Sequence, residues 1–276
     1  MKKFIYGLIF FVLSFTLLFN IFLLKNTNQN SFAINNKNNI PKMCIVIDDF
    51  GSYDQSGIET LMKSNAPITC AIIPFVDNSK LHYDLILKKG FEPILHMPME
   101  SHVNLPKDWY GPVYIKNNDS EIDVKNKLQN CLNEFKNIKG FNIHIGSGVS
   151  QNKNLMNIIY NFAKENDLYF LDSRTILTTA TEDACKDTNS IYLGRDVFLE
   201  ADKNKSYSGV CYRLLEGAKI AQEKGYSIVI GHIGAEGGEN TSNAILDTIP
   251  KIEKMGVKIV TLNEIYQDLN QEKTQK

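Results

Sequence analysis

The chain has 276 residues, and 30 lysines and arginines against 31 aspartates and glutamates leave a formal net charge of −1 at pH 7. This balance argues against an electrostatic nucleic-acid binder, which would need a basic face. A content of 43% hydrophobic and 22% charged residues excludes a disordered chain and is typical of a globular protein.

The amino terminus has the pattern of a membrane segment. Lys2 and Lys3 precede an uncharged apolar run, residues 4–24, which would span about 31 Å as a helix, close to the roughly 30 Å hydrocarbon core of a bilayer. Two interpretations compete: an uncleaved signal anchor, and a cleaved signal peptide with Ser-Phe-Ala at residues 31–33 as its cleavage pattern. We favour the anchor, because the run exceeds the roughly 7–15 apolar residues of a signal peptide.

The residues around this segment predict the domain organisation. Lysines before the run predict an amino terminus inside the cytoplasm and a body outside it. We therefore expect a signal anchor over residues 1–25, an Asn-rich linker over 26–40, a folded domain over 41–268 and a polar tail over 269–276. We expect the folded domain to be membrane-anchored and extracytoplasmic, or secreted if the signal is cleaved.

A strand–helix rhythm runs through the body of the chain. Four times a helical segment ends in lysine and glycine and leads into an apolar strand: at Gly90, Gly140, Gly225 and Gly256. Glycine after a helix is the usual left-handed cap, and lysine complements the negative end of the helix dipole. Alternating strands and helices predict a parallel α/β fold. The spacing fits an irregular (β/α) barrel of about seven strands.

One stretch, residues 100–120, breaks the rhythm. It holds two prolines, a glycine and Trp109, the single tryptophan of the chain. We expect a long loop that covers the functional site.

Polar residues gather where the predicted strands end. The strand ends carry Asp48 and Asp49, His96 with Glu100, His144, Asp172 with Arg174, and His232. In α/β barrels the carboxyl ends of the strands form the active face. Three histidines and two acidic sites at corresponding positions therefore predict a common site.

This set of side chains suits a metal-dependent hydrolase. Zinc is bound by imidazole nitrogen and carboxylate oxygen, and a catalytic zinc keeps one position open. We expect Asp49, His96 and His144 to bind a divalent metal, for which zinc fits best. Such a metal lowers the pKa of its water toward roughly 7 and polarises a carbonyl. Asp48 would then be the general base and His232 the acid that protonates the leaving group. Arg174 or Arg195 would orient a carboxylate.

Six segments of the chain resemble the divergent polysaccharide deacetylase family. They occur in this order: residues 45–51 (IVIDDFG), 95–100 (LHMPME), 144–147 (HIGS), 170–175 (FLDSRT), 195–199 (RDVFL) and 230–232 (IGH). The family is related to the NodB-type carbohydrate esterases, which have an irregular (β/α) barrel. The resemblance covers residues 41–264. It implies metal-dependent removal of acetyl groups from an N-acetylated cell-envelope polysaccharide, with peptidoglycan as one candidate.

The resemblance also assigns roles to individual residues. In the NodB-type enzymes an Asp-Asp motif gives one base and one metal ligand, which correspond here to Asp48 and Asp49. The late Leu-x-His motif of the wider family resembles residues 230–232, so His232 takes the acid role. The substrate contacts are expected from the remaining polar residues of the matched segments, namely Glu100, Asp172, Arg174 and Arg195.

The sequence departs from the wider pattern at several positions. The NodB-type enzymes place both histidine ligands in one H-x-x-x-H motif, but Glu100 stands four residues after His96. His144 must therefore supply the second histidine, or the site is altered. The divergent family would have Asn-Asn-His-Met-Gly-Ser at residues 142–147, Asp in place of Glu200 and a proline after His232. These changes affect residues that orient the ligands.

Two other functions remain open at this point. The chain could be a non-catalytic envelope protein that binds a glycan or a partner on the same barrel. It could also be a glycosidase that uses Asp49 and Asp172, since such enzymes place two carboxylates roughly 5–9.5 Å apart. The glycosidase ranks last, because it leaves the three histidines unexplained.

Overall fold

The computed structural model describes residues 40–177, 179–201 and 205–275. The predicted anchor and nearly all of the predicted linker lie outside these residues. Within the described part, we find no helix with the length and apolar character to cross a bilayer. Residues from Pro41 onward form one compact unit.

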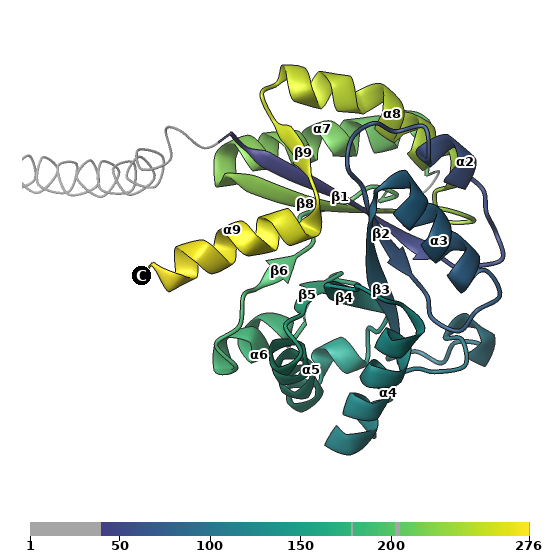
Figure 1. Cartoon of the computed structure of the whole chain (residues 1–276), viewed down its shortest axis with the longest axis vertical. Coiled ribbons are helices and arrows are strands. Elements are labelled where there is room, and N and C mark those ends of the chain that lie inside the picture. Colours follow the sequence, from purple (N-terminus) through teal and green to yellow (C-terminus); the bar gives the residue numbers. More distant parts are fainter. Residues whose placement is uncertain (1–39, 178, 202–204, 276) are drawn as a thin grey trace, which may run out of the picture. The chain divides into compact units, whose positions relative to one another are not determined.

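The unit is built on a curled sheet of parallel strands (Figure 1). The described residues form nine strands: β1 (Lys42–Phe50), β2 (Thr69–Ile72), β3 (Glu92–Met99), β4 (Gly140–Ile145), β5 (Tyr169–Asp172), β6 (Leu193–Gly194), β7 (Val197–Phe198), β8 (Tyr226–His232) and β9 (Lys258–Val260). Their order is β6-β5-β4-β3-β2-β1-β8-β7. The start of β1 also pairs with β9, and every pairing is parallel.

The sheet is an open half-barrel and differs in this respect from a closed barrel. Its edge strands β6 and β7 are two residues each, too short to leave a periodic signal, which is why the sequence predicted about seven strands. Arg195 and Asp196 connect these two edges across the gap. The amide of Arg195 donates to the carbonyl of Asp172, and the amide of Asp196 donates to the carbonyl of Ile228.

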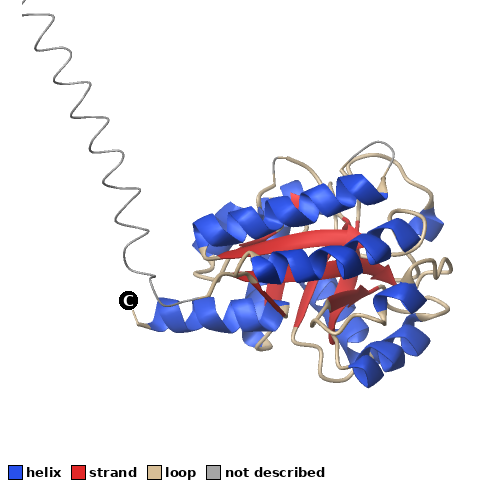
Figure 2. Ribbon diagram, turned by 90° about the horizontal axis from the view of Figure 1, so that it is seen from above, coloured by secondary structure: helices blue, strands red, loops and turns tan. Residues whose placement is uncertain are grey.

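Helices cover the outer face of the sheet (Figure 2). They are α2 (Ile58–Leu61), α3 (Ser79–Lys89), α4 (Glu121–Glu134), α5 (Lys153–Glu165), α6 (Thr181–Asp187), α7 (Tyr207–Lys224) and α8 (Gly238–Lys254). The chain also has short 3-10 turns at Lys107–Trp109 and Val149–Gln151, and a last helix, α9 (Leu262–Thr274), which packs against the inner face. The last helix runs through residues 269–274, where the sequence predicted a polar tail.

Glycines end two of the helices as predicted. Gly90 and Gly225 cap α3 and α7 in the left-handed conformation. The prediction was wrong for Gly140, which instead begins β4. A Cβ atom at Gly140 would lie 2.0 Å from the Tyr169 ring, so this glycine is needed for close packing between β4 and β5. The left-handed residue before β4 is Asn137, with φ 61°.

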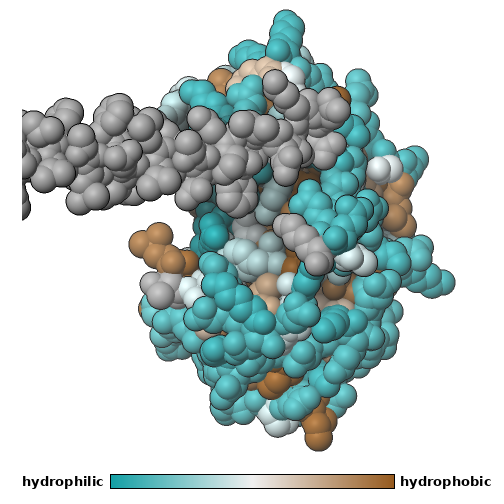
Figure 3. Space-filling model, turned by 90° about the vertical axis from the view of Figure 1, so that its left-hand side faces the viewer, coloured by the Kyte–Doolittle hydropathy of each residue, from teal (hydrophilic) through white to brown (hydrophobic). Residues whose placement is uncertain are grey.

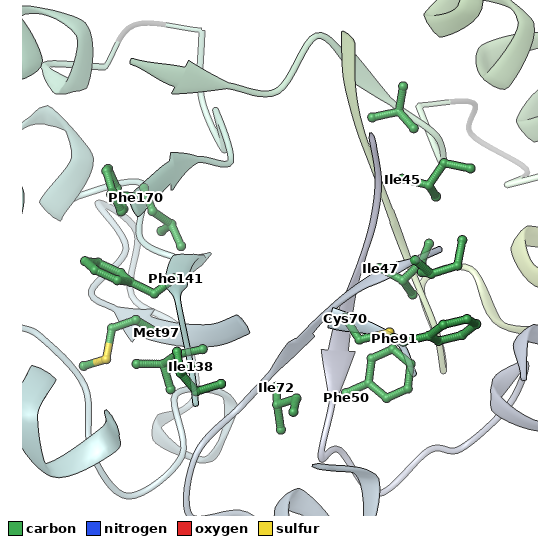
Figure 4. Close-up of a cluster of buried hydrophobic side chains, with 14 of the residues drawn as sticks. Ile45, Ile47, Phe50, Cys70, Ile72, Phe91, Met97, Ile138, Phe141 and Phe170 are labelled. Carbon is green, nitrogen blue, oxygen red and sulfur yellow. The ribbon is translucent and has the colours of Figure 1, made fainter. Parts of the chain in front are cut away.

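Strand alternation divides the core into two clusters. Met43, Ile45 and Ile47 of β1 belong to the large cluster that contains the buried faces of α2–α8; Figure 4 shows part of it. Cys44 and Val46 belong to the second cluster, which packs the inner face of the sheet against Leu262 and Ile265 at the start of α9. The inner face is therefore closed at one end by α9. The carboxyl ends of the strands lie at the other end.

A buried carboxylate fastens α9 to the sheet. Glu92, at the start of β3, accepts hydrogen bonds from the backbone amides of Leu262 (2.8 Å) and Asn263 (3.1 Å). It also accepts from the hydroxyls of Thr69 and Tyr169. Burial raises the pKa of Glu92 even though these four donors favour its charged form.

The surface of the molecule is largely hydrophilic on the face in Figure 3, where hydrophobic side chains are few and scattered.

Candidate metal centre and the surrounding cavity

A cavity of about 1490 Å³ opens at the carboxyl ends of the strands. Six of the nine site residues predicted from the sequence line it: Asp48, Asp49, His96, His144, Arg195 and His232. Seven residues of the long segment between β3 and α4 line the same cavity: Lys107, Asp108, Trp109, Gly111, Pro112, Tyr114 and Lys116. The prediction that this segment forms a loop over the site is therefore confirmed.

The end of β1 turns two consecutive carboxylates toward one point. In a regular strand successive side chains point to opposite faces. The pairing of β1 with β2 shifts register between Ile47 and Phe50, and Asp49 has a φ of 70°. This irregularity brings the Asp49 carboxylate to the inner side, where Asp48 already points. Both then approach the same imidazole: His96 Nε2 lies 3.4 Å from Asp49 Oδ1 and 3.8 Å from Asp48 Oδ2.

Asp49, His96 and His144 form a three-residue group that could hold a metal ion. Asp49 Oδ1 lies 3.4 Å from His96 Nε2 and 3.4 Å from His144 Nδ1. One ligand atom from each residue falls within 4.8 Å of the others. The imidazole rings of the two histidines meet edge-on, with centroids 4.8 Å apart. Two nitrogens and one carboxylate oxygen are a donor set that suits zinc.

Hydrogen bonds select the nitrogen that each histidine presents. Asn142 donates from Nδ2 to Asp48 Oδ1 at 2.8 Å, which leaves its Oδ1 to accept from His96 Nδ1 at 2.6 Å. The Nε2 atom of His96 is therefore unprotonated in the neutral ring. His144 Nε2 lies 2.9 Å from the carbonyl oxygen of Trp109, so it carries the proton and Nδ1 is free to ligate. Such partners fix the tautomer and orientation of a metal-binding histidine.

The two aspartates differ in acidity. Burial is the largest influence on Asp48 and raises its pKa, although the charges of His96 and His232 oppose the rise. Burial also opposes the charge of Asp49, but the neighbouring imidazoles of His144 and His96 hold the pKa of Asp49 well below its ordinary value. Asp49 is thus the permanent anion, and Asp48 is the carboxylate that can take up a proton.

His232 faces Asp48 from the end of β8. Its Nε2 atom lies 4.0 Å from Asp48 Oδ2, and its Nδ1 atom donates to Glu200 Oε2 at 3.1 Å. Burial disfavours the imidazolium, but the hydrogen bond to Glu200 and the nearby carboxylates outweigh it and raise the pKa of His232 to about 9. His232 is therefore a proton donor at neutral pH.

Glu200 is itself held firmly. Its side chain is fully buried and accepts from the backbone amide of His232 and from Thr241 Oγ1. A Cβ atom at Gly231 or Gly237 would lie 3.0 Å and 2.6 Å from Glu200 Oε1. The two glycines therefore make the room that a glutamate needs where the family pattern would place the shorter aspartate.

Arg195 lines the cavity and also fastens the gap in the sheet. Its guanidinium donates to the carbonyl oxygens of Ser173 and Arg174, both at 2.6 Å, and lies 4.9 Å from the centre of the Phe198 ring. Arg174, in contrast, donates to Tyr192 and to the carbonyl of Arg195. Of the described residues that line the cavity, Arg195 is one and Arg174 is not.

The structure does not bring Glu100 and Asp172 to the cavity lining within the described residues. Glu100 accepts a hydrogen bond from the amide of Asn117 at 2.7 Å and so holds the loop. Asp172 is fully buried and lies on the outer side, because Leu171 before it faces inward. Its carboxylate accepts from the Arg174 amide and from three hydroxyl groups, those of Thr179, Thr181 and Tyr192.

Three supporting residues were not among the predicted catalytic, substrate-binding or metal-binding residues, although Glu200 was noted as a departure from the family pattern. Asn142 and Glu200 orient His96 and His232, as described above. His82 of α3 accepts a hydrogen bond from the amide of Gly51 at 2.7 Å, directly after the Asp48–Asp49 turn. A signal existed for Asn142, which lies two residues before His144 and so on the same face of β4. His82 left no comparable signal, since it lies in a helix far from Gly51 in the sequence.

The profile of the family described as "Divergent polysaccharide deacetylase" matches residues 45–266. An uncharacterized protein of Haemophilus influenzae is 28% identical over 191 residues, which is 69% of this chain and 66% of that protein. The uncharacterized Escherichia coli protein YibQ is 28% identical over 193 residues, or 69% of this chain and 58% of that protein. The chain thus spans less than two thirds of both relatives.

A solved structure is similar in fold. An uncharacterized protein from Agrobacterium tumefaciens C58 aligns with a TM-score of 0.73 at 17% identity, over 83% of this chain and 90% of that one. At this identity the similarity concerns the fold alone.

Proposed function

Because this chain belongs to the divergent polysaccharide deacetylase family, we propose that it removes acetyl groups from an N-acetylated polysaccharide of the cell envelope, such as peptidoglycan. One observation carries the proposal. Asp49, His96 and His144 converge on one point, while Asp48 and His232 face that point with a base and an acid. Amide hydrolysis requires both proton transfers.

Asp49, His96 and His144 would hold a divalent cation, with Zn²⁺ as our choice. A bound cation of this kind activates water and polarises a carbonyl oxygen. Asn142 and the Trp109 carbonyl keep the correct histidine nitrogens turned to it. The two histidine ligands come from the adjacent strands β3 and β4, and this explains why the chain can lack an H-x-x-x-H motif.

Asp48 and His232 would move the protons. Asp48 takes the proton of the attacking water, which its raised pKa favours. His232, charged at neutral pH and held by Glu200, donates a proton to the amide nitrogen as the C–N bond breaks. The products are acetate and the free amine. Arg195 is our candidate for a substrate contact, since it lines the cavity; a substrate role for Glu100, Asp172 or Arg174 stays a prediction.

We also propose that residues 1–25 anchor the protein in the membrane and that residues 26–40 tether an extracytoplasmic domain. The uncharged run after Lys2 and Lys3 supports this proposal. Protease protection of the domain in intact cells would test the orientation, and the mass of the mature chain would distinguish an anchor from a cleaved signal.

Metal content and acetate release test the proposed activity. The full chain is purified in detergent without chelator or nickel, and metal per chain is counted by mass spectrometry. We expect about one zinc per chain in the wild type and a loss of zinc in His144→Ala. His102→Ala is the matched control, since His102 bonds to Ser147 instead of to Asp49.

Acetate release is then measured on acetylated peptidoglycan. We expect release by the wild type and by His102→Ala, and none by Asp48→Asn, which should keep its zinc. Bound zinc without acetate release would favour the non-catalytic, glycan-binding function. Equal zinc content in His144→Ala and wild type would exclude the proposed centre.

A further inference from the structure

Three exposed aromatic side chains line the same cavity as the metal-ligand group. Each comes from the loop after a different strand: Tyr53 after β1, Phe75 after β2 and Trp109 after β3. Their exposed fractions are 90%, 41% and 60%. Leaving a large apolar side chain in water forgoes about 1.5–3 kcal/mol of burial, and an exposed apolar patch beside a cavity marks a binding surface.

Phe75 is held in this place at a cost in backbone strain. Its φ is 59°, a conformation that bulky residues rarely adopt and that costs on the order of 1–3 kcal/mol. Its amide donates to Glu134 Oε2 at 2.7 Å, which fastens the strained turn to α4. A strained residue with a partly exposed ring suggests that the ring itself has a function at the cavity.

Trp109 is presented by an ordered part of the long loop. Beside it the rings of Tyr110 and Tyr114 stack with centroids 4.6 Å apart. Ile115 then joins β3 by a parallel bridge to Met99. Because the Trp109 carbonyl also accepts from His144 Nε2, the exposed indole is linked through its own backbone to a metal-ligand candidate. A ligand that stacks on Trp109 therefore lies next to the proposed reaction centre.

The polar groups around these rings identify the chemistry of the ligand. Lys107, Asp108, Lys116 and Asp54 line the cavity together with the aromatic residues. A pyranose ring has an apolar C–H face that stacks on aromatic rings, and hydroxyl and amide groups at its edge that bond to charged side chains. A purely apolar ligand would cover these charged groups without offering them hydrogen bonds. The mixture fits a sugar.

We propose that Tyr53, Phe75 and Trp109 form a platform that binds N-acetylhexosamine units next to the unit whose acetyl group reaches the metal centre. The proposal rests on the proposed function and narrows it. With three rings from three loops, the platform recognises several sugar units at once. The substrate is therefore the interior of a glycan chain, and a single sugar binds poorly.

Tryptophan fluorescence gives a direct test, because Trp109 is the single tryptophan of the chain. The full protein, kept in a detergent without a sugar headgroup, is titrated with N-acetylglucosamine and with its β-1,4-linked disaccharide and tetrasaccharide. We expect the tetrasaccharide to change the emission and to bind at least tenfold more tightly than the monosaccharide. No change with the tetrasaccharide up to its solubility limit, or equal affinity for all three, overturns the platform.

Variants separate the platform from the chemistry. Tyr53→Ala and Phe75→Ala should each weaken tetrasaccharide binding about three- to tenfold, the usual range for one lost aromatic contact, and keep the zinc content. Tyr53 is so exposed that its removal leaves folding intact even if Phe75→Ala unfolds. Tyr212→Ala is the matched control, since Tyr212 is 65% exposed on α7 and should not affect binding. Unchanged affinity in Tyr53→Ala would refute its part in the platform.

The binding result is independent of turnover. Tight tetrasaccharide binding without acetate release would contradict the proposed hydrolysis and support the platform. Acetate release from a glycan, with fluorescence insensitive to that glycan, would support the hydrolysis and contradict the platform.

Discussion

Asn142 is the residue whose replacement tests the logic of the site most directly. It is fully buried and makes two hydrogen bonds, one to His96 Nδ1 and one to Asp48 Oδ1. Asn142→Leu keeps the approximate volume and removes both. Each buried partner left unsatisfied costs about 1–3 kcal/mol. With two such partners, we therefore expect the free energy of unfolding to fall by about 2–6 kcal/mol, or roughly 4–24 °C in Tm for a domain of this size.

The same change should weaken metal binding. Without Asn142 Oδ1, nothing selects the tautomer of His96 that turns a bare Nε2 atom toward Asp49. Loss of such a partner typically lowers metal affinity 10–100-fold, which corresponds to about 1.4–2.8 kcal/mol. A competition titration with a chromogenic chelator measures this affinity, and urea denaturation measures stability. Asn157→Leu, at a half-buried asparagine of α5, is the control.

Asn142→Asp separates the two hydrogen bonds. A carboxylate at this position still accepts from His96 Nδ1, so we expect metal affinity close to that of the wild type. It also places a second negative charge against Asp48 and raises the pKa of that residue further. The rise of activity with pH, which requires deprotonated Asp48, should therefore move to higher pH. If Asn142→Leu bound zinc as tightly as the wild type, the orienting role of Asn142 would be refuted.

Changes at three further positions test other parts of the site. Glu200→Gln removes the charge that supports the imidazolium of His232. The pKa of His232, about 9 in the wild type, should therefore fall in an NMR titration. Because the mechanism needs protonated His232, the loss of activity on the alkaline side should begin at a lower pH than in the wild type. Asp49→Asn should keep the fold but lose zinc, because asparagine tolerates a φ of 70°. Asp49→Val should in addition lose about 1–3 kcal/mol of stability in urea. Gly237→Ala should displace Glu200, because the added Cβ would lie 2.3 Å from the His232 carbonyl oxygen and 2.6 Å from Glu200 Oε1. Both Tm and the pKa of His232 should fall. Gly90→Ala is the control: the added Cβ meets open space, so the pKa of His232 should not change.

Much of the fold and of the site followed from local patterns. The repeated strand–helix rhythm predicted a parallel α/β unit, and the carboxyl ends of its strands predicted where polar residues meet. Asp48, His96, His144 and His232 do face one cavity. This part was predictable because strands in a parallel sheet all end at the same edge, so strand ends that are distant in the sequence become neighbours.

Asp172 shows what strand ends alone do not determine. It stands at the end of β5, as His232 stands at the end of β8, yet it faces outward and bonds to α6 through Thr181. Alternation decides between the two faces, and a one-residue change of phase moves a side chain from the site to the outer core. Leu171 packs in the inner cluster, so Asp172, the next residue along the strand, points to the outer face.

Backbone conformation at the strand ends accounts for the rest. Asp49, Ile145 and Arg174 lie at or just after the ends of β1, β4 and β5. Their φ angles are 70°, 63° and 47°, in the left-handed region that non-glycine residues avoid. Such residues cost on the order of 1–3 kcal/mol each and persist only where the surrounding structure imposes the conformation.

At Asp49 this conformation interrupts the alternation of the strand, so that two consecutive carboxylates reach the same imidazole. Regular strand alternation gives no sign of this, because it would place the two side chains on opposite faces of the sheet. The convergence of Asp48 and Asp49 is therefore a product of packing around β1, including the hydrogen bond from Gly51 to His82, and a site of this kind requires the folded sheet to exist before its ligands can meet.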